Sequence, residues 1–544
     1  MSFDQTTLNK AETTDRKNLA LELEKSQDAV WSGGKALSKL EEWVVKNATW
    51  LAIGVIAAAF AVRVAYSASC YLNPDEAQHF DAARPDTWLG VFRASHRLAH
   101  PPLFIFVLHA ILYLGRTEVI LRLPSIAGGT AALWLTFAWI RRTLGGIPAL
   151  AGLLFMAISP AAISASTEVR QYGLLLFFIC GSVYATERAL SDRSTNWAII
   201  QGLFLLGALL THYTSSVVIL SLDIYVLIRY IAGDIPRRVL FTFICAQLVL
   251  AAVLGWLYLS YIRHADVFIP SNLLYLKSFY YVPSSERLLD FSRRAFVATF
   301  SYLVSQKRAI FSMLAFLAGV AALMTGRTKA PRLMSLLILT PFVVGFATAL
   351  FQVLPFAGSR HQTYLLPFLA AGFSAALAWI PRKLAVPLLL AGAVYAPFWI
   401  LRTPPDNNRR TVPIGDMTAA INYIDRVVPG NAPLFMDDKT HYILKYYLGG
   451  RDPNLDSWQH RNDEKLDGHL VIAPRAFGWV FSPKDVLTKV NESAKDLGVP
   501  RGEPLWIISV AWLDQESLAS ELPAGAYRSA NEFGVISVIE TERD

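Results

Sequence analysis

Long apolar runs with few or no charged residues constrain this chain more than any other feature of its sequence. Each run is roughly 18–25 residues long, the length that an α-helix needs to cross a hydrocarbon layer of about 30 Å. Charged residues make up 17% of the chain, whereas soluble globular proteins carry about 25%. The sequence therefore predicts an α-helical polytopic membrane protein.

The apolar runs predict about eleven membrane-spanning helices, which together form one membrane domain over residues 49–401. They cover residues 49–69, 121–140, 147–164, 169–187, 197–211, 214–231, 238–262, 309–325, 333–354, 361–380 and 384–401. The preceding residues 1–48 are polar and of mixed charge. They predict a soluble tail, and they do not have the pattern of a signal peptide.

Basic residues alternate between the short loops and predict the orientation of the bundle. The loops at 164–167, 211–215 and 355–360 nearly lack lysine and arginine, whereas the alternate loops are rich in them. The positive-inside rule places the basic loops, and with them the N-terminus, in the cytoplasm. An odd number of spans then places the C-terminus outside. The basic loops carry Arg141, Arg142, Arg188, Arg193, Arg229, Arg237, Arg238, Arg327, Lys329, Arg332, Arg382 and Lys383.

Residues 100–115 are apolar but fit this orientation only if they do not cross the membrane. The segment is about 15 residues long, opens with two prolines and carries His109. We therefore expect a short helix at the outer interface. Two long outer loops result, at about residues 70–119 and 263–308.

The composition changes after Arg402. A linker from Pro404 to Asn408 leads into short apolar stretches that alternate with helical ones. Strands are expected at residues 433–436, 470–473, 505–510 and 535–539, and helices at 417–428 and 484–497. This alternation predicts a small α/β domain over residues 402–544, on the outer side of the membrane.

Net charge and cysteine content exclude two other classes of protein. The net charge of +8 does not indicate a nucleic acid partner, because the basic residues lie between apolar runs, where they orient a membrane protein. Cys180 and Cys245, two of the three cysteines, lie inside apolar runs. No disulfide framework is therefore expected, and the lipid bilayer is the expected partner.

The first candidate site follows the first apolar run, between Asn73 and Phe80. A carboxylate at the membrane surface, from Asp75 or Glu76, can accept a proton from a hydroxyl as a general base. The same stretch is also typical of a helix start, with Asn73 as N-cap, Pro74 at the first helical position and two acids in the first turn. The sequence alone leaves both interpretations open.

The second candidate site spans Thr167 to Tyr172, at the outer end of the fourth predicted span. Charged side chains near lipid are costly unless they are paired or solvated. In a functional interpretation, Glu168 faces a sugar and Arg170 faces a phosphate. In a structural interpretation, Arg170 and Tyr172 only anchor the helix at the interface.

Two further candidates lie at outer ends of spans. His212 and Tyr213 separate two apolar runs, and Arg360 and His361 lie in a loop that otherwise lacks lysine and arginine. Such an arginine suits an anionic lipid phosphate, whereas a single histidine at a helix end is more often a structural donor. All four candidate sites map to the same membrane face, which favours one shared function.

Short motifs occur in a fixed order along the membrane domain. They are Asp75-Glu76, His-Pro-Pro-Leu (residues 100–103), Arg-Leu-Pro-Ser (122–125), Glu-x-Arg-x-Tyr (168–172), Leu-Thr-His-Tyr (210–213) and Arg-His-x-x-Tyr-Leu-Leu-Pro (360–367). This order resembles the polyprenyl-phosphate-sugar transferases of GT-C type, which include protein O-mannosyltransferases and bacterial lipid A aminoarabinose transferases. The resemblance covers about residues 49–401.

The resemblance implies a membrane glycosyltransferase. Such an enzyme moves a sugar from a polyprenyl-phosphate donor to a hydroxyl of an envelope acceptor (lipopolysaccharide, glycan or protein) with inversion. It implies a bacterial inner membrane location, with the active site and the C-terminal domain on the periplasmic side. A phosphate tethered to lipid is a workable leaving group, so no cofactor is expected, although a divalent metal is not excluded.

The resemblance also implies roles for residues of this chain. Asp75 would be the general base, with Glu76 and Glu168 as further catalytic candidates. Donor phosphate would be bound by Arg170, Arg360 and His361. Sugar or acceptor would be bound by His100, Tyr172, His212 and Tyr213.

Two observations limit the resemblance. Residues 263–308 are too few for the separate trefoil domain that protein O-mannosyltransferases carry in a long loop, and this leaves the acceptor open. The main alternative is a lipid or glycan transporter or flippase, which predicts internal repeats, broken spans and charges at mid-membrane depth. No obvious repeat is present, and the notable charges lie at span ends, which favours the transferase.

Overall fold

A computed structural model of the chain describes residues 39–96, 98, 100–264, 276–326, 329–380, 382–402, 413–430, 432–448, 463–466, 469–472, 483–510, 518–522 and 525–543. Most of the predicted N-terminal tail and the predicted linker at Pro404 to Asn408 lie outside these residues.

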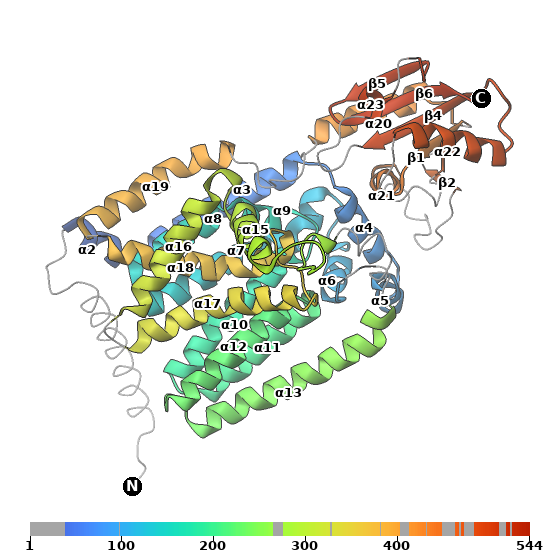
Figure 1. Cartoon of the computed structure of the whole chain (residues 1–544). Coiled ribbons are helices and arrows are strands. Elements are labelled where there is room, and N and C mark those ends of the chain that lie inside the picture. Colours follow the sequence, from blue (N-terminus) through green and yellow to red (C-terminus); the bar gives the residue numbers. More distant parts are fainter. Residues whose placement is uncertain are drawn as a thin grey trace, which may run out of the picture.

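Long helices form a bundle in which every predicted apolar run coincides with one helix or two (Figure 1). The helices are α3 (Ala48–Ser69), α7 (Glu118–Leu144), α8 (Gly146–Ile158), α9 (Pro160–Thr167), α10 (Tyr172–Ser191), α11 (Thr195–Thr211), α12 (Ser215–Ile231), α13 (Arg237–Ser260), α16 (Ala309–Met324), α17 (Lys329–Leu350), α18 (Leu366–Trp379) and α19 (Arg382–Arg402). The predicted α-helical membrane fold is therefore confirmed.

Length and composition identify 7 helices in the described residues that can cross a membrane, or up to 8 if the pair α8–α9, bent by 59°, forms one span. Helix α11 is apolar but has only 17 residues, and α18 has 14. The predicted number of about eleven spans therefore stays a prediction, as does their orientation.

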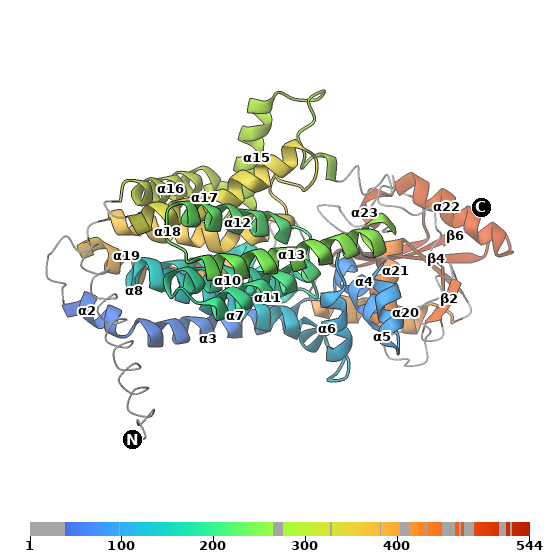
Figure 2. The same ribbon diagram turned by 90° about the horizontal axis from the view of Figure 1, so that it is seen from below.

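Short helices and turns connect the long ones. They are α2 (Lys39–Lys46), α4 (Pro74–Ala83), α5 (Trp88–Ser95), α6 (Leu103–Ile111), α15 (Leu288–Leu303) and the 3₁₀ turns η1 (Ile262–His264), η3 (Gln306–Arg308) and η4 (Arg360–Leu365). Helix α6 has 9 residues, too few to cross a membrane, so the expected short helix within residues 100–115 is confirmed. Helices α4 to α6 lie at the end of the bundle that carries the C-terminal domain, and α2 lies at the opposite end (Figures 1 and 2).

The C-terminal region contains a mixed sheet of six strands in the order β2-β3-β1-β4-β6-β5. Strand β1 runs parallel to β3 and β4, and the other pairs are antiparallel. The elements are α20 (Ile414–Val427), β1 (Pro433–Met436), α21 (Asp438–Tyr447), β2 (Asp463–Leu466), β3 (His469–Ile472), α22 (Pro483–Asp496), β4 (Pro504–Val510), α23 (Leu518–Glu521), β5 (Ser529–Phe533) and β6 (Ile536–Glu542). The predicted strands and helices are confirmed, and β2 and β5 are additional edge strands.

Close packing between α16 and α18 depends on Gly319. A Cβ atom at this position would lie 1.9 Å from the carbonyl oxygen of Gly372 in α18. Backbone atoms at that distance must move apart, so the helices approach this closely only because Gly319 has no side chain.

Replacing Gly319 by Ala should therefore destabilise the bundle by about 1–3 kcal/mol, the usual cost of overpacking. Gly255 in α13 is a matched control, because nothing lies within 4 Å of a Cβ there. Gly255→Ala should leave stability unchanged or raise it slightly, since Ala favours helix. Thermal unfolding in detergent measures both, and equal effects of the two substitutions would contradict the packing argument.

The predicted orientation can be tested by labelling single cysteines. In a variant that lacks Cys70, Cys180 and Cys245, Lys495→Cys should react with a membrane-impermeant maleimide in intact spheroplasts. Ser191→Cys, in the last turn of α10, should react only after permeabilisation. The opposite pattern would show that the bundle is inverted.

Candidate active site

Asn73 and Glu76 begin helix α4 in the way that its sequence predicts. The Asn73 side chain accepts a hydrogen bond from the Glu76 amide, the Glu76 carboxylate accepts one from the Asn73 amide, and Pro74 occupies the first turn. This capping box satisfies backbone donors that the helix itself leaves unpaired. It also fixes the start of α4, and with it the direction in which the side chain of Asp75 points.

A buried ion pair ties α4 to the membrane helices. Arg122 of α7 donates from Nε to Oε1 of Glu76 (2.8 Å) and from Nη2 to Oε2 (2.9 Å), and the two side chains are 2% and 1% exposed. The Val169 amide also donates to Oε1 of Glu76, at 2.7 Å. The remaining donors of Arg122 bind the backbone carbonyls of Ser67, Cys70 and Tyr71.

The Arg-Leu-Pro-Ser motif holds both charged segments of the site. Its first residue, Arg122, anchors α4, and its last, Ser125, donates a hydrogen bond of 2.7 Å to the carbonyl of Arg170. Helix α10 also packs closely here, since a Cβ at Gly173 would lie 2.4 Å from the carbonyl oxygen of Ser125. The motif thus fixes the turn before α10 relative to α4.

Asp75 lies where three segments of the chain meet. Its Oδ2 is 2.5 Å from Nη1 of Arg170, in the turn before α10, and 2.7 Å from Nη1 of Arg360, in η4. Asp75 and Arg360 are 285 residues apart in the sequence. Burial alone raises the pKa of Asp75, but the charges of Arg170 and Arg360 outweigh it and hold that pKa below its usual range.

Glu168 is the second carboxylate close to the arginine pair. Ser164 donates a hydrogen bond of 2.9 Å to its Oε1. Burial raises the pKa of Glu168, although the positive charges of Arg170 and Arg360 oppose the rise. Glu168 therefore holds a proton more readily than Asp75 does.

Four imidazoles from four segments form a row beside Asp75. The ring centroids of His79 and His100 are 6.0 Å apart, those of His100 and His212 are 4.9 Å apart, and those of His212 and His361 are 5.7 Å apart. Tyr172 lies 5.3 Å from His212. His100, Tyr172, His212 and His361 of the predicted candidates thus lie in one region. His79, four residues after Asp75 on α4, is an addition to them.

Backbone contacts fix the tautomers of two of these histidines. Nδ1 of His79 donates to the carbonyl of Asp75 at 2.6 Å, which leaves its Nε2 as an acceptor. Nδ1 of His212 accepts the amide proton of Thr214 at 3.1 Å, which leaves its Nε2–H as a donor. Burial, with the charge of Arg170 adding to it, lowers the pKa of each histidine to about 3, so both are neutral at pH 7.

Several polar atoms of this region are buried and have no hydrogen-bond partner among the described residues. They include Nε2 of His79, Nδ1 of His100, Nε2 of His212 and the hydroxyl of Tyr213. An unpaired buried polar group costs about 1–3 kcal/mol. Such a concentration of unpaired donors and acceptors suits a ligand with several hydroxyl groups.

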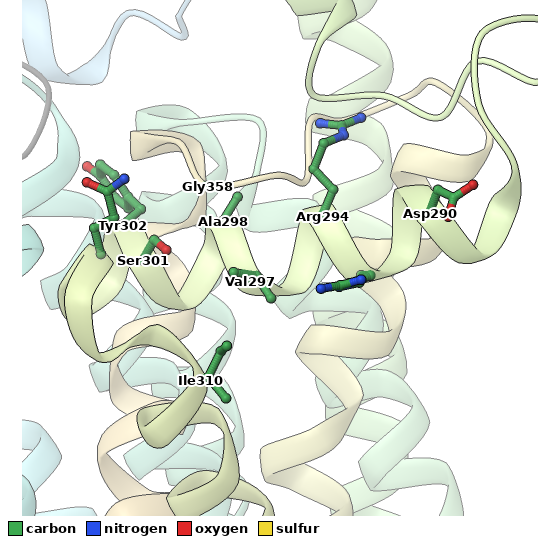
Figure 3. Close-up of a pocket in the computed structure, with 10 residues that line it drawn as sticks. Asp290, Arg294, Val297, Ala298, Ser301, Tyr302, Ile310 and Gly358 are labelled. Carbon is green, nitrogen blue, oxygen red and sulfur yellow. The ribbon is translucent and has the colours of Figure 1, made fainter.

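A groove lies along α15, with Gly358 at its edge (Figure 3). It has a volume of about 580 Å³, with two arginines near one end and apolar residues along α15. Gly358 precedes Arg360 by two residues, so the groove borders the loop that binds Asp75. Its lining includes Arg293, Arg294, Val297, Ala298, Tyr302 and Ile310.

Within the described part of the chain, no group of three or more His, Cys, Asp or Glu side chains is arranged to hold a metal ion. The expectation that the reaction needs no metal stays a prediction.

The helical bundle, the short helices at one end and the C-terminal α/β region together resemble solved membrane proteins of known fold. Residues 99–258 match the family model described as dolichyl-phosphate-mannose-protein mannosyltransferase. The crystal structure of ArnT from Cupriavidus metallidurans bound to undecaprenyl phosphate has a TM-score of 0.54 and 15% identity, covering 90% of this chain and 97% of that one. Its apo structure gives 0.52 and 16%, with 91% and 98% covered.

The likeness to an oligosaccharyltransferase is weaker. An Archaeoglobus fulgidus oligosaccharyltransferase tethered with an acceptor peptide gives a TM-score of 0.47 and 11% identity, covering 86% of this chain and 70% of that one. No curated protein sequence matches the chain significantly. The ArnT likeness shows the fold, and with the family model it confirms the predicted resemblance to the GT-C superfamily.

Glu76→Gln should destabilise the protein by about 3–5 kcal/mol, because it leaves the buried Arg122 without its counter-charge. Asp290→Asn is a matched control, since it makes the same chemical change in an exposed pair with Arg287 (52% and 86% exposed). That pair should contribute about 0–1 kcal/mol. Thermal unfolding in detergent tests both, and a stable Glu76→Gln protein would show that the buried pair is not structural.

Proposed function

We propose that this protein is a membrane glycosyltransferase that moves a sugar from a polyprenyl-phosphate donor to a hydroxyl of an envelope acceptor. The observation that carries the proposal is the contact of two arginines, from the turn before α10 and from η4, with the carboxylate of Asp75. A carboxylate that can accept a proton and two guanidiniums that can bind a phosphate are the groups that this reaction needs.

In the proposed reaction, the acceptor oxygen attacks the anomeric carbon of the donor sugar and its proton passes to Asp75. The bond between the anomeric carbon and the phosphate oxygen breaks at the same time, so the configuration inverts. The polyprenyl phosphate leaves with the electron pair of that bond. Arg170 and Arg360 stabilise the charge that develops on it, in a site that excludes most water.

The arginine pair also gives the proposed base two states. Without donor, Arg170 and Arg360 hold the pKa of Asp75 low, and a carboxylate of low pKa is a weak base. A donor phosphate competes for the same guanidiniums and weakens their hold on the carboxylate. Asp75 would then become basic only when the donor is in place, which limits idle proton transfer.

Glu76 and Glu168 take different parts in this proposal. Glu76 is 1% exposed and bound by Arg122 and the Val169 amide, so we assign it to holding α4 rather than to the reaction itself. Glu168 is the second catalytic candidate, because the arginine charges act on it as well.

Sugar recognition falls to the row of neutral histidines. His79 offers an acceptor and His212 offers a donor, a pattern that pairs with hydroxyl groups. Neutral rings beside two arginines favour a hydroxyl-rich sugar, with His100, Tyr172 and Tyr213 completing the proposed binding region. His361, the member of the row that follows Arg360 in the sequence, lies on the phosphate side of this proposal.

The α15 groove is the proposed entry for a lipid-linked substrate. Arg293 suits an anionic headgroup, while Val297 and Ile310 suit its hydrocarbon (Figure 3). Arg294 lines the groove as well but is already paired with Glu286 at 2.6 Å. In this proposal the bundle lies in a bacterial inner membrane, with the site on the periplasmic side. The break between α8 and α9 is a feature that a transporter would share, but α9 leads directly into Glu168 and Arg170, and this favours the transferase.

Asp75→Asn should reduce release of the carrier lipid by about 100-fold or more, the usual scale for losing a general base. The variant should nevertheless bind polyprenyl phosphate as tightly as wild type or more tightly, because Arg170 and Arg360 lose their competing carboxylate. Arg360→Gln should weaken that binding by about tenfold, as expected for one charge-assisted hydrogen bond. Release from a panel of polyprenyl-phosphate sugars in nanodiscs, with binding of undecaprenyl phosphate, measures all three.

Arg426→Gln is the control for Arg360→Gln, since Arg426 is exposed on α20 and bonds the carbonyl of Asn422 in the same helix, outside both the site and the groove. It should change neither binding nor release. Wild-type turnover by a folded Asp75→Asn protein would remove Asp75 as the base and turn attention to Glu168. No release by the wild-type protein from any carrier would count against the transferase itself.

A further inference from the structure

The last turn of α21, in the C-terminal domain, contacts α4, the helix whose first turn contains Asp75. Lys445 Nζ lies 3.4 Å from Oδ1 of Asp81, and the two side chains are only 4% and 11% exposed. The ring of Tyr446 packs edge-on against Phe80, with centroids 4.9 Å apart. Figures 1 and 2 both show α21 beside α4.

Tyr447 reaches the other end of α4. Its hydroxyl accepts the backbone amide proton of Leu72 at 2.9 Å. Leu72 is fully buried and precedes Asp75 by three residues. Arg122 binds the carbonyl of Tyr71 on the same connection at 2.7 Å, so side chains from α7 and α21 together satisfy backbone groups between α3 and α4.

Tyr71 itself belongs to the core of the C-terminal domain. It is 4% exposed and packs in one hydrophobic cluster with residues of α20, α21 and the sheet, including Met417, Ile421 and Ile443. Its neighbour Cys70 forms an isolated antiparallel bridge with Pro413. The domain is therefore built around the segment that leads into α4 and is not merely tethered to the bundle.

We propose that the C-terminal domain positions Asp75 for the reaction, with Tyr447 and Lys445 as positioning residues. This inference rests on the proposed role of Asp75. The hydroxyl of Tyr447 fixes the chain just before α4, and Lys445 fixes Asp81 near its end, so the helix is held at both ends over about 15 Å. A displacement of about 1 Å at a reacting group can cost on the order of 100-fold in rate.

The two ends of α4 are held by different partners, and α5 and α6 pack along the helix, with His109 of α6 bonded to the carbonyl of Ala83 at 2.8 Å. Glu76, in its first turn, is held by Arg122 of the bundle, whereas Phe80, Asp81 and the preceding Leu72 are held by α21. Loss of the bundle contact would release the helix from the membrane domain. Loss of the α21 contact would leave α4 anchored at Glu76 and packed against α5 and α6, but it would release the backbone at Leu72. A small shift of the chain there would move Asp75 relative to the two arginines and leave the arginines in place.

Tyr447→Phe tests the proposal, because it removes one hydroxyl and keeps the ring. Turnover of a polyprenyl-phosphate sugar that the wild-type protein cleaves should fall by about tenfold, with KM for that donor unchanged. Tm should fall only slightly, because the buried Leu72 amide loses its hydrogen bond. Tyr423→Phe is the matched control, since its hydroxyl bonds Asn531 inside the same domain. The control should keep wild-type turnover. Wild-type kcat for Tyr447→Phe, or equal losses in both variants, would overturn the proposal.

Combining substitutions separates positioning from general loss of structure. In the Asp75→Asn background, Tyr447→Phe should cause no further loss of release, because Tyr447 acts through Asp75. Additive losses would overturn the inference and leave the proposed function standing. An Asp75→Asn protein with normal turnover would instead remove the proposed base. If Tyr447→Phe does not fold, Lys445→Arg, which keeps the charge but moves its attachment point, carries the same test.

Discussion

A single guanidinium, that of Arg122, holds together the parts of this protein on which its site depends. It is buried between membrane helices, it binds both oxygens of Glu76, and it binds carbonyls of the chain between α3 and α4. A buried charge of this kind is tolerable only when a counter-charge and hydrogen bonds surround it. Glu76 provides the charge, and its second bond to Val169 extends the network to the turn before α10.

Charge balance then governs the site above this anchor. The carboxylate of Asp75 contacts two arginines, and the positive charges of the same arginines also act on the carboxyl group of Glu168. Two guanidiniums contact the single carboxylate of Asp75, an arrangement that suits a phosphate, whereas four neutral imidazoles lie on one side of it. In the proposed reaction the charged arginines would bind the phosphate, and the neutral histidines next to them would bind the sugar.

The sequence predicts much of this arrangement because its signals are local. Apolar runs predict the helices, and the pattern from Asn73 to Glu76 predicts the start of α4. In the structure Glu76 completes the capping box, whereas Asp75 faces the two arginines of the site. Arg170, Arg360 and His361 could be placed at one end of the bundle from loop charges. The sequence carried no signal that Arg360 contacts Asp75, or that Tyr447 contacts Leu72, because such contacts join segments hundreds of residues apart. His79 could have been found from its spacing of four residues from Asp75 on one helix face.

The burial of Tyr71 in the core of the C-terminal domain has a consequence for biosynthesis. Tyr71 leaves the ribosome among the first residues after the first apolar helix, whereas most of the strands and helices that enclose it are made last. The domain cannot complete its core until the early segment reaches the same side of the membrane. A chain cut short before the sheet would therefore leave the aromatic side chain of Tyr71 exposed beside α4.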